Sequence, residues 1–350
     1  MDKLIRWSIH PLRLSLRYTW KISRNATDEK TNLIVSCGSD RHAGYGEAAP
    51  NIRYDETPER LLAQFQEILS GLEQSTESPQ QLHELFERQG TAYALRFAIE
   101  SAWLHHRHGG DRPSFQKQLN IPFRDKVLTS YTVPIMDPSL LRSFYHQERL
   151  GRFSSIKLKI DRDSGNDLLE ELLACDPEKV LIDANEAFTD VEDCIRFLEK
   201  IRRLPVGLVE QPLPSRMRDE AIYLKKYSPF LLFADEAITH DADLEFIEKA
   251  YHGINMKLMK AGGYLKGMEI LRNAKERGLQ TMIGCMVETT LGISSAMNLC
   301  GLADHVDLDS FLLLKEEPYD LAREAEGELS FTHASHMDMT AACRPAEIRN

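Results

Sequence analysis

The sequence predicts an α/β protein in which a closed barrel of parallel strands follows an α+β domain. Three observations predict this fold. After about residue 125, short apolar runs alternate with helical segments and recur about every 20 to 28 residues. That interval is typical of a strand–helix unit, and the eight runs present are the number that closes a parallel barrel. The chain of 350 residues has room for both parts, since a domain takes up roughly 150 residues.

The first 124 residues predict the α+β domain. Apolar and polar side chains alternate at 12–16, and the motif GYGEAAP follows a second apolar stretch at 33–37. This pattern indicates antiparallel strands joined by a turn. From about residue 59 to 87 the pattern becomes helical, and ALRFAIESA then repeats alanine every fourth residue, on one close-packing face of a second helix.

The barrel is predicted over residues 125–315, and residues 316–350 are predicted to return to the N-terminal domain. The predicted strands are 127–133, 155–160, 180–185, 207–212, 231–236, 254–260, 280–285 and 305–309. Open doubly wound sheets alternate strands and helices in the same way. The count of eight strands favours the closed barrel.

The charge balance argues against several classes of partner. The chain has 43 basic and 54 acidic side chains and a net charge of −11, so its surface should repel nucleic acids and anionic membranes. No apolar stretch of about 18 residues is present, and the apolar part of MDKLIRWSIH is too short for a signal peptide. We therefore expect a cytoplasmic protein. Its six scattered cysteines, without a CxxC pair, are interpreted as mostly buried thiols.

Several predicted strands carry charges where a strand buried on both faces should be apolar. Lys157 and Lys159 share one face, because strand side chains alternate. Taken alone, KLK is typical of a solvated sheet face. The ends of the next four strands change this interpretation, because each carries a charge: Asp183, Glu210, Asp235 and Lys257. A parallel barrel gathers its catalytic groups at these C-terminal strand ends.

The three strand-end carboxylates predict a metal site. Two like charges about 4 Å apart cost roughly 4 kcal/mol at an effective dielectric of 20. Asp183, Glu210 and Asp235 therefore require a cation when they converge. Oxygen ligands without adjacent His or Cys indicate a hard ion, Mg²⁺ first and Mn²⁺ second.

Two lysines on either side of such a metal predict proton abstraction next to a carboxylate. The metal stabilises the negative charge that develops as the α-carbon loses its proton. Lys159 and Lys257 can each take or return that proton. The expected reaction is inversion at one carbon.

Together these motifs resemble the muconate-lactonizing branch of the enolase superfamily. The resemblance rests on K157-L-K159, D183-A-N185, E210-Q-P212, D235-E236 and K257-L-M-K260-A-G-G, and on GYGEAAP and ALRFAIESA for that family's capping domain. It implies a modified TIM barrel, (β/α)7β, capped by the N-terminal third and the C-terminal tail. It also implies one Mg²⁺ per subunit, Lys159 and Lys257 as acid and base, and Lys157 and Asn185 beside the substrate.

A further motif points to one group within this branch. D307-L-D309 resembles the aspartate pair with which dipeptide epimerases hold the substrate's ammonium group. By the same resemblance, Arg24 meets the side-chain carboxylate of a C-terminal Glu, with Arg17, Lys21 and Lys30 as alternatives. Members of this group isomerise L-Ala-D-Glu to L-Ala-L-Glu in murein peptide recycling. The resemblance thus predicts a metal-dependent dipeptide epimerase, with a small-molecule substrate and a homo-oligomeric assembly.

Other interpretations remain open at this point. The same barrel could serve a cycloisomerase, an o-succinylbenzoate synthase or an N-acylamino acid racemase. A Schiff-base aldolase would use Lys159 or Lys257 as nucleophile, and a peptide-binding protein would use neither. Asp307 and Asp309 could cap the segment that follows them, and Asn185 could serve as a turn former. Glu236 and Glu288 are expected to be structural.

Overall fold

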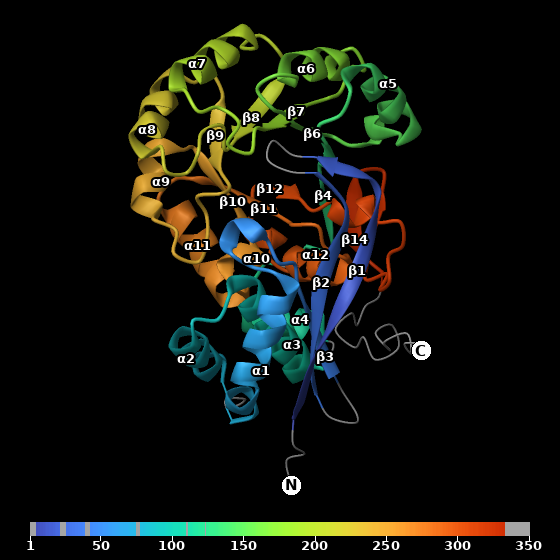
Figure 1. Cartoon of the computed structure of the whole chain (residues 1–350), viewed down its shortest axis with the longest axis vertical. Coiled ribbons are helices and arrows are strands. Elements are labelled where there is room, and N and C mark those ends of the chain that lie inside the picture. The colour runs from blue at the N-terminus through green and yellow to red at the C-terminus, as the bar shows by residue number, and fades with distance from the viewer. Residues whose placement is uncertain are drawn as a thin grey trace.

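The computed structural model describes residues 5–21, 26–38, 43–74, 78–109, 111–122 and 124–332. Figure 1 shows a ring of strands and helices, with the long hairpin of β1 (Arg6–Lys21) and β2 (Ala26–Gly38) standing beside it. A group of helices from the N-terminal third lies below this ring in the same view. The predicted barrel with an N-terminal capping domain is confirmed.

Eight parallel strands form the barrel. In chain order they are β5 (Tyr131–Val133), β6 (Ile156–Lys159), β7 (Val180–Asp183), β8 (Val206–Glu210), β9 (Leu231–Ala234), β10 (Gly253–Lys257), β11 (Gln280–Gly284) and β12 (His305–Asp307). Each strand pairs with its neighbours in the sequence. Between the first and last strands, Ser130 N donates to Val306 O at 3.3 Å, which brings the two edges of the sheet together.

Helices connect and cover these strands. They are α5 (Pro138–Gln147), α6 (Gly165–Leu173), α7 (Val191–Lys200), α8 (Arg218–Tyr227), α9 (Leu244–Ala250), α10 (Leu258–Ala261), α11 (Tyr264–Glu276) and α12 (Thr290–Met297), with short 3₁₀ turns at Leu150–Arg152, Cys300–Leu302 and Ser310–Leu313. Most bury one apolar stripe against the strands. In α6, for example, Leu168, Leu169 and Leu172 are buried while its acidic residues face outward, as an amphipathic helix requires.

All eight predicted strands are present with somewhat different ends, and two of them differ in a way that changes the fold locally. The strand expected at 254–260 ends at Lys257, and α10 begins at the next residue. The run expected at 127–133 is split, because Thr129 N bonds to Gly327 O whereas Ser130 N bonds to Val306 O. The chain thus leaves one sheet and enters another between these residues. The first part, β4 (Lys126–Leu128), pairs outside the barrel.

In the residues that the structure describes, the capping domain combines an antiparallel sheet with four α-helices. β3 (Ala43–Ala48) completes the sheet of β1 and β2, and the helices are α1 (Pro58–Gln74), α2 (Pro79–Gln89), α3 (Tyr93–His108) and α4 (Arg112–Gln118). The alanine face of α3 packs directly on β3. A Cβ on Gly46 would lie 2.0 Å from the carbonyl oxygen of Ala98, so glycine is required for this close approach.

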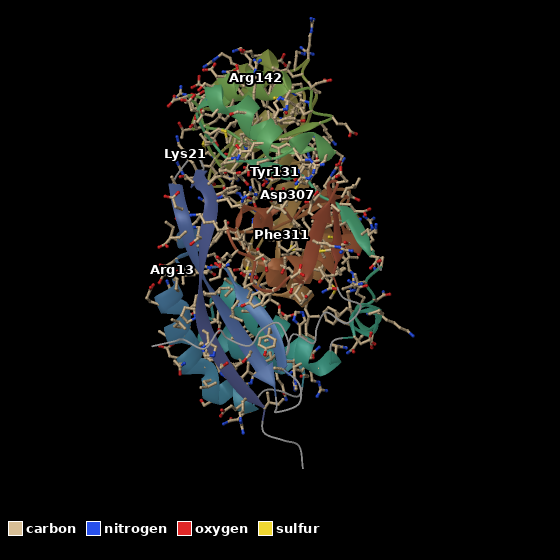
Figure 2. All side chains as sticks on the ribbon, turned by 90° about the vertical axis from the view of Figure 1, so that its right-hand side faces the viewer. Arg13, Lys21, Tyr131, Arg142, Asp307 and Phe311 are labelled. Atoms are coloured by element: carbon tan, nitrogen blue, oxygen red, sulfur yellow. The ribbon has the colours of Figure 1, made fainter. Side chains whose placement is uncertain are left out.

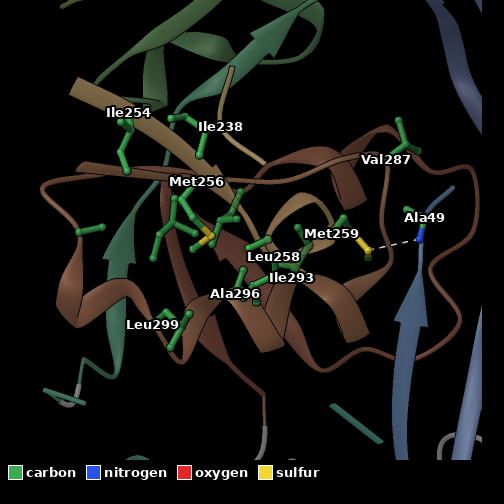
Figure 3. Packing of buried hydrophobic residues seen from close by; sticks show 14 of the residues in the cluster. Ala49, Ile238, Ile254, Met256, Leu258, Met259, Val287, Ile293, Ala296 and Leu299 are labelled. Atoms are coloured by element: carbon green, nitrogen blue, oxygen red, sulfur yellow. Dashed lines mark hydrogen bonds between the residues drawn. The ribbon is translucent and has the colours of Figure 1, made fainter. Parts of the chain in front are cut away.

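The capping domain and the barrel share one hydrophobic core. Figure 3 shows Ala49, which follows β3, donating its N–H to Met259 Sδ on α10 at 3.3 Å. Val287 and Ile293 lie in the same cluster and come from the loop after β11 and from α12. The packing fixes the sheet of the cap against the carboxyl ends of the late barrel strands.

The segment after the barrel contacts both parts of the molecule. Leu321 lies in one hydrophobic cluster with Ile34 of β2, whereas β13 (Ala322–Ala325) pairs with β14 (Glu328–Phe331) and β14 pairs with β4, in a sheet separate from that of the cap. Residues 333–350 lie outside the described residues, so the predicted return of 316–350 and the domain bounds at 124 and 315 stay predictions. No helix in the described part of the chain is long and apolar enough to cross a membrane.

Candidate active site

The C-terminal ends of β6, β7 and β8 place three predicted site residues in one row. Lys159 pairs in register with Asp183, and Asp183 pairs with Glu210. Adjacent residues in one row of a sheet point to the same side, here the barrel interior. All three side chains are buried, and Asp183 and Glu210 have no exposed surface.

A second row lies across the barrel. Lys257 at the end of β10 pairs with Gly284, which pairs with Asp307 at the end of β12. β6 and β10 are four positions apart in an eight-stranded ring, so Lys159 and Lys257 approach from opposite sides. Gly284 makes room for the side chain of Asn255, since a Cβ on Gly284 would lie 2.4 Å from Asn255 Oδ1.

Lys157 joins the two rows at the centre of the barrel. Its Nζ lies 2.9 Å from Glu210 Oε2, 3.3 Å from Asp183 Oδ2 and 2.7 Å from Asp307 Oδ2. Burial lowers the pKa of this lysine, but the surrounding carboxylates outweigh burial and place its pKa well above the ordinary value. Lys157 is therefore a fixed positive charge beneath the site.

Lys159 lies at the mouth of the barrel, between carboxylate, amide and indole groups. Its Nζ donates to Asp183 Oδ2 at 2.7 Å and to Asn185 Oδ1 at 3.0 Å, and it lies 5.5 Å from the ring centre of Trp20. Asn185 has a φ of +41° and thus also forms the turn after β7. Its Nδ2 donates to Glu236 Oε1 at 3.3 Å, which places Glu236 in the same network.

Asp235 is held by two lysines from one strand–helix junction. Lys257 Nζ donates to Asp235 Oδ2 at 3.0 Å, and Lys260 Nζ donates to Asp235 Oδ1 at 2.5 Å. Burial lowers the pKa of Lys257, but Asp235 outweighs burial and raises that pKa above its ordinary value. Lys257 is thus an ammonium ion in this arrangement and can act as a proton donor.

The charges at the base of the site suit a divalent cation. Four lysines and six carboxylates meet there, which leaves a formal charge of −2: Lys157, Lys159, Lys257 and Lys260, with Asp183, Glu210, Asp235, Glu236, Asp307 and Asp309. Burial, reinforced by Asp183 and Asp235, raises the pKa of Glu210 to about 8. Within the described ranges, no three Asp, Glu, His or Cys side chains converge as they stand, since ammonium groups lie between the carboxylates. The donor set itself, oxygen only with excess negative charge, fits a hard divalent ion.

Asp307 and Asp309 face the first strand of the barrel. Ser130 Oγ donates to Asp307 Oδ1 at 2.5 Å, and the backbone N–H of Thr132 donates to Asp309 Oδ2. Asp309 precedes the 3₁₀ turn Ser310–Leu313 but makes no capping bond to it, so the interpretation as a helix cap is wrong. Burial, with Asp307 nearby, raises the pKa of Asp309 to about 7.

A cavity of about 540 Å³ lies above these groups, between the barrel and the cap. Figure 2 shows Asp307 in the region between the barrel strands and the β1–β2 hairpin. The cap contributes Trp20, Lys30, Asn32, Arg53 and Tyr54 to the cavity wall, and the loop after β11 contributes Cys285, Met286 and Val287. The site is thus built from both domains.

All predicted site residues that the structure describes are brought together. Lys157, Lys159, Asn185, Asp235, Lys257, Asp307 and Asp309 line the cavity, and Asp183 and Glu210 lie beneath it in contact with Lys157. Arg24 lies outside the described residues. The catalytic, metal-binding and substrate-binding roles of all these residues stay predictions.

Among the polar residues at the base of the site, sequence reasoning missed Lys260 and Asn255. Asn255 Nδ2 donates to Glu210 Oε1 at 2.9 Å, and strand alternation could have found it, because it lies two residues before Lys257 on the same face. Lys260 could be found only by recognising that the strand ends at Lys257. One helical turn then returns its side chain to Asp235.

Comparisons with known proteins agree with this architecture. The family model described as "Enolase C-terminal domain-like" matches residues 142–337. An L-Ala-D/L-amino acid epimerase of Pedosphaera parvula is 31% identical over 335 residues, which cover 93% of this chain and 95% of that protein. An L-Ala-D/L-Glu epimerase of Bacteroides thetaiotaomicron is 25% identical over 338 residues, covering 93% and 85%.

A solved structure shows the same fold. The dipeptide epimerase of Enterococcus faecalis, in complex with Mg and the dipeptide L-Leu-L-Tyr, aligns with a TM-score of 0.83 at 23% identity, over 96% of this chain and 99% of that chain. The match to the family model and the extent of the similarity to the Pedosphaera parvula protein exceed what a shared fold alone requires. The chain therefore belongs to the enolase superfamily, among the dipeptide epimerases of its muconate-lactonizing branch.

Proposed function

We propose that this protein inverts the α-carbon of the C-terminal residue of a dipeptide, such as L-Ala-D-Glu, by proton transfer between Lys159 and Lys257. The observation that carries the proposal is the placement of these lysines on opposite strands of the ring. Inversion needs one group that removes a proton from one face of the carbon and another that returns a proton to the other face. A pair of lysines on opposite walls meets that requirement.

The other charges orient the substrate between the two lysines. Asp183, Glu210 and Asp235 lie at or just after the ends of the three strands between β6 and β10, and Asp307 and Asp309 lie at and just after the end of β12 on the opposite arc. The α-carboxylate would face the first set, and the ammonium group of the dipeptide would face the second. The lysines would then lie on either side of the plane formed when the α-carbon loses its proton.

The three strand-end carboxylates would hold Mg²⁺, with Mn²⁺ as a possible substitute. When bound, the ion supplies positive charge that stabilises the deprotonated substrate carboxylate. Lys157 adds a fixed positive charge from below, since its Nζ lies within 3.3 Å of both Asp183 and Glu210. Asn185 orients Lys159 through a 3.0 Å hydrogen bond.

The relatives support an epimerase over the other reactions of the branch. The relatives from Pedosphaera parvula and Bacteroides thetaiotaomicron are both named as epimerases of L-Ala dipeptides. A cycloisomerase acting on a non-amino acid would have no use for two buried aspartates opposite the metal set. An aldolase would need one nucleophilic lysine, and a second lysine held on the opposite wall would be unexplained.

A dipeptide screen in D₂O tests the proposal. We expect the Mg²⁺-loaded protein to incorporate one deuterium at the α-carbon of the C-terminal residue and to convert each diastereomer into the other. Mass spectrometry measures the incorporation, and ¹H NMR measures the diastereomer ratio. A screen of L-Ala-L-Xaa dipeptides and N-succinyl amino acids that shows exchange only with the acylated amino acids would overturn the proposal in favour of a racemase.

A further inference from the structure

Of the three proposed metal ligands, Asp235 is the one that the barrel sheet does not hold. Asp183 and Glu210 are the last residues of β7 and β8 and pair with each other in register. Asp235 lies one residue beyond the end of β9, and the register partner of Glu210 on that strand is Phe233. A contact outside the strand ladder must therefore fix Asp235 relative to Glu210.

The side chain of Gln211, the residue after the end of β8, makes that contact. Its Oε1 accepts the backbone N–H of Asp235 at 2.9 Å and that of Ala237 at 3.2 Å. At the other end of the amide, Nε2 donates to Leu213 O at 2.9 Å and to Tyr251 Oη at 2.9 Å. Two N–H groups can only face the amide oxygen and a carbonyl can only face the amide nitrogen, so the orientation of this side chain is fixed.

The main chain of Gln211 joins the strands on either side of β8. Its N–H donates to Phe233 O on β9 at 2.9 Å, and its carbonyl accepts from Glu186 N, in the loop after β7, at 2.8 Å. Its φ of +37° lies in the left-handed region, which residues other than glycine rarely adopt. Such strain persists only where the surrounding structure fixes it, and it clusters at functional sites. Gln211 has no exposed surface, so it cannot contact a substrate itself.

The other bonds of Asp235 connect it to a different part of the barrel. Lys260 donates both to the carbonyl oxygen and to Oδ1 of Asp235, and Lys257 donates to its Oδ2. These lysines belong to the junction of β10 and α10. Gln211, by contrast, ties Asp235 to the strand that carries Glu210. The spacing of the two carboxylates therefore depends on Gln211.

We infer that Gln211 is a positioning residue that sets the spacing of Glu210 and Asp235 for a small divalent cation, and that Tyr251 acts through Gln211. The inference rests on the proposed function, since it takes these two carboxylates as metal ligands. Mg²⁺ requires near-ideal octahedral geometry at about 2.0–2.1 Å, whereas Ca²⁺ accepts flexible geometry at about 2.3–2.6 Å. Ligands with a fixed spacing can therefore favour the smaller ion, and loosening them should weaken Mg²⁺ binding more than Ca²⁺ binding.

Isothermal titration calorimetry of the metal-free protein with Mg²⁺ and with Ca²⁺ tests this inference. Gln211→Met should raise the Kd for Mg²⁺ by about tenfold or more and the Kd for Ca²⁺ by less than about threefold. Tyr251→Phe leaves one proton of Gln211 Nε2 without its acceptor and should raise the Kd for Mg²⁺ by about threefold. Combining the two substitutions should add nothing to the effect of Gln211→Met, because Tyr251 acts through Gln211.

Gln116→Met is the matched control. Gln116 is also a buried glutamine and its Nε2 donates to Asn298 Oδ1 at 3.1 Å, but it lies on α4 of the cap. This variant should bind both ions as the wild type does. Thermal unfolding shows whether each variant is folded. If Gln211→Met unfolds, Tyr251→Phe carries the test, and a wild-type Kd for Mg²⁺ in that variant overturns the inference.

The remaining outcomes separate the inference from the proposed function. The inference is wrong if Gln211→Met binds Mg²⁺ as tightly as the wild type, or if it loses Mg²⁺ and Ca²⁺ affinity to the same extent, as a general loss of structure would cause. A double variant that binds Mg²⁺ more weakly than Gln211→Met would contradict the role of Tyr251. A wild type that binds no Mg²⁺ overturns the proposed metal site and the inference with it. Epimerisation is judged separately, by deuterium incorporation in the wild type.

Discussion

Lys159 Nζ lies 2.7 Å from Asp183 Oδ2, and the two residues are register partners at the ends of neighbouring strands. The pair couples the proposed base to one of the proposed metal ligands. Lys257 Nζ lies 3.0 Å from Asp235 Oδ2, another proposed metal ligand. Each lysine thus reaches the cavity from its own side, held by a different carboxylate.

Isotope exchange should distinguish the roles of Lys159 and Lys257. Lys257→Ala removes the group on one wall, so epimerisation should fall by about 10²-fold or more, while Lys159 can still exchange the α-proton of one diastereomer with retention. Lys159→Ala should exchange the other diastereomer. ¹H NMR in D₂O measures both rates. Exchange of the same diastereomer by both variants would contradict the placement of the two groups on opposite faces.

Removal of divalent cations should abolish turnover. Without the ion, the carboxylates at the base of the site outnumber the lysines and would repel the substrate carboxylate, so chelation should stop α-proton exchange until Mg²⁺ is restored. Mg²⁺ should also raise the melting temperature of the wild type through preferential binding to the folded state. Glu210→Gln should lose most of that increase. Full activity in the chelated protein, or an equal increase in Glu210→Gln, would show that these carboxylates do not bind the ion.

The free ammonium group of the substrate should matter as much as its carboxylate. N-acetyl-L-Ala-L-Glu would leave Asp307 and Asp309 buried without a cation from the substrate, so its kcat/KM should fall by about 10²-fold, equivalent to roughly 3 kcal/mol. Asp309→Asn should lower kcat/KM for L-Ala-L-Glu. It should also narrow the difference in kcat/KM between the free and the acetylated dipeptide. Equal kcat/KM for both substrates with the wild type would favour a cycloisomerase or an acylamino acid racemase.

The positions of site residues that depend on local sequence patterns were predictable from the sequence. The alternation of strand side chains placed Lys157 and Lys159 together, and the repeat of strand–helix units brought Asp183, Glu210 and Asp235 to one end of the barrel. Both patterns depend on residues close in the chain, and the eight strands lie where they were expected. The helix that begins after Lys257 was missed, because a run of apolar residues does not show where a strand ends.

Contacts between distant segments could not be predicted in this way. The carboxylate of Glu47 on β3 accepts from Thr289 N at 3.1 Å and from Gly292 N at 3.0 Å, at the beginning of α12. Nothing in the sequence near either segment indicates the other. This contact holds the loop after β11 against Asn32, and through Asn32 it shapes the wall around Lys30.

A buried histidine between the cap and the barrel should make stability depend on pH. His105 of α3 lies with Nδ1 2.6 Å from Tyr45 O and Nε2 3.1 Å from Tyr264 Oη. Because a carbonyl only accepts, Nδ1 carries a proton. Burial lowers its pKa to about 4. The folded protein therefore binds fewer protons than the unfolded chain between the unfolded pKa of about 6.5 and this value.

The contribution of His105 is complete above pH 6.5 and is lost as the pH falls toward 4. The loss should amount to about 3 kcal/mol in the free energy of unfolding. His105→Gln should therefore lower the free energy of unfolding at pH 7.5. At pH 4 its difference in unfolding free energy from the wild type should be smaller by about that amount. Denaturant unfolding at both pH values measures it, with His10→Gln, an exposed histidine of β1, as the matched control. If the difference between the wild type and His105→Gln were the same at both pH values, His105 would not be the group that titrates.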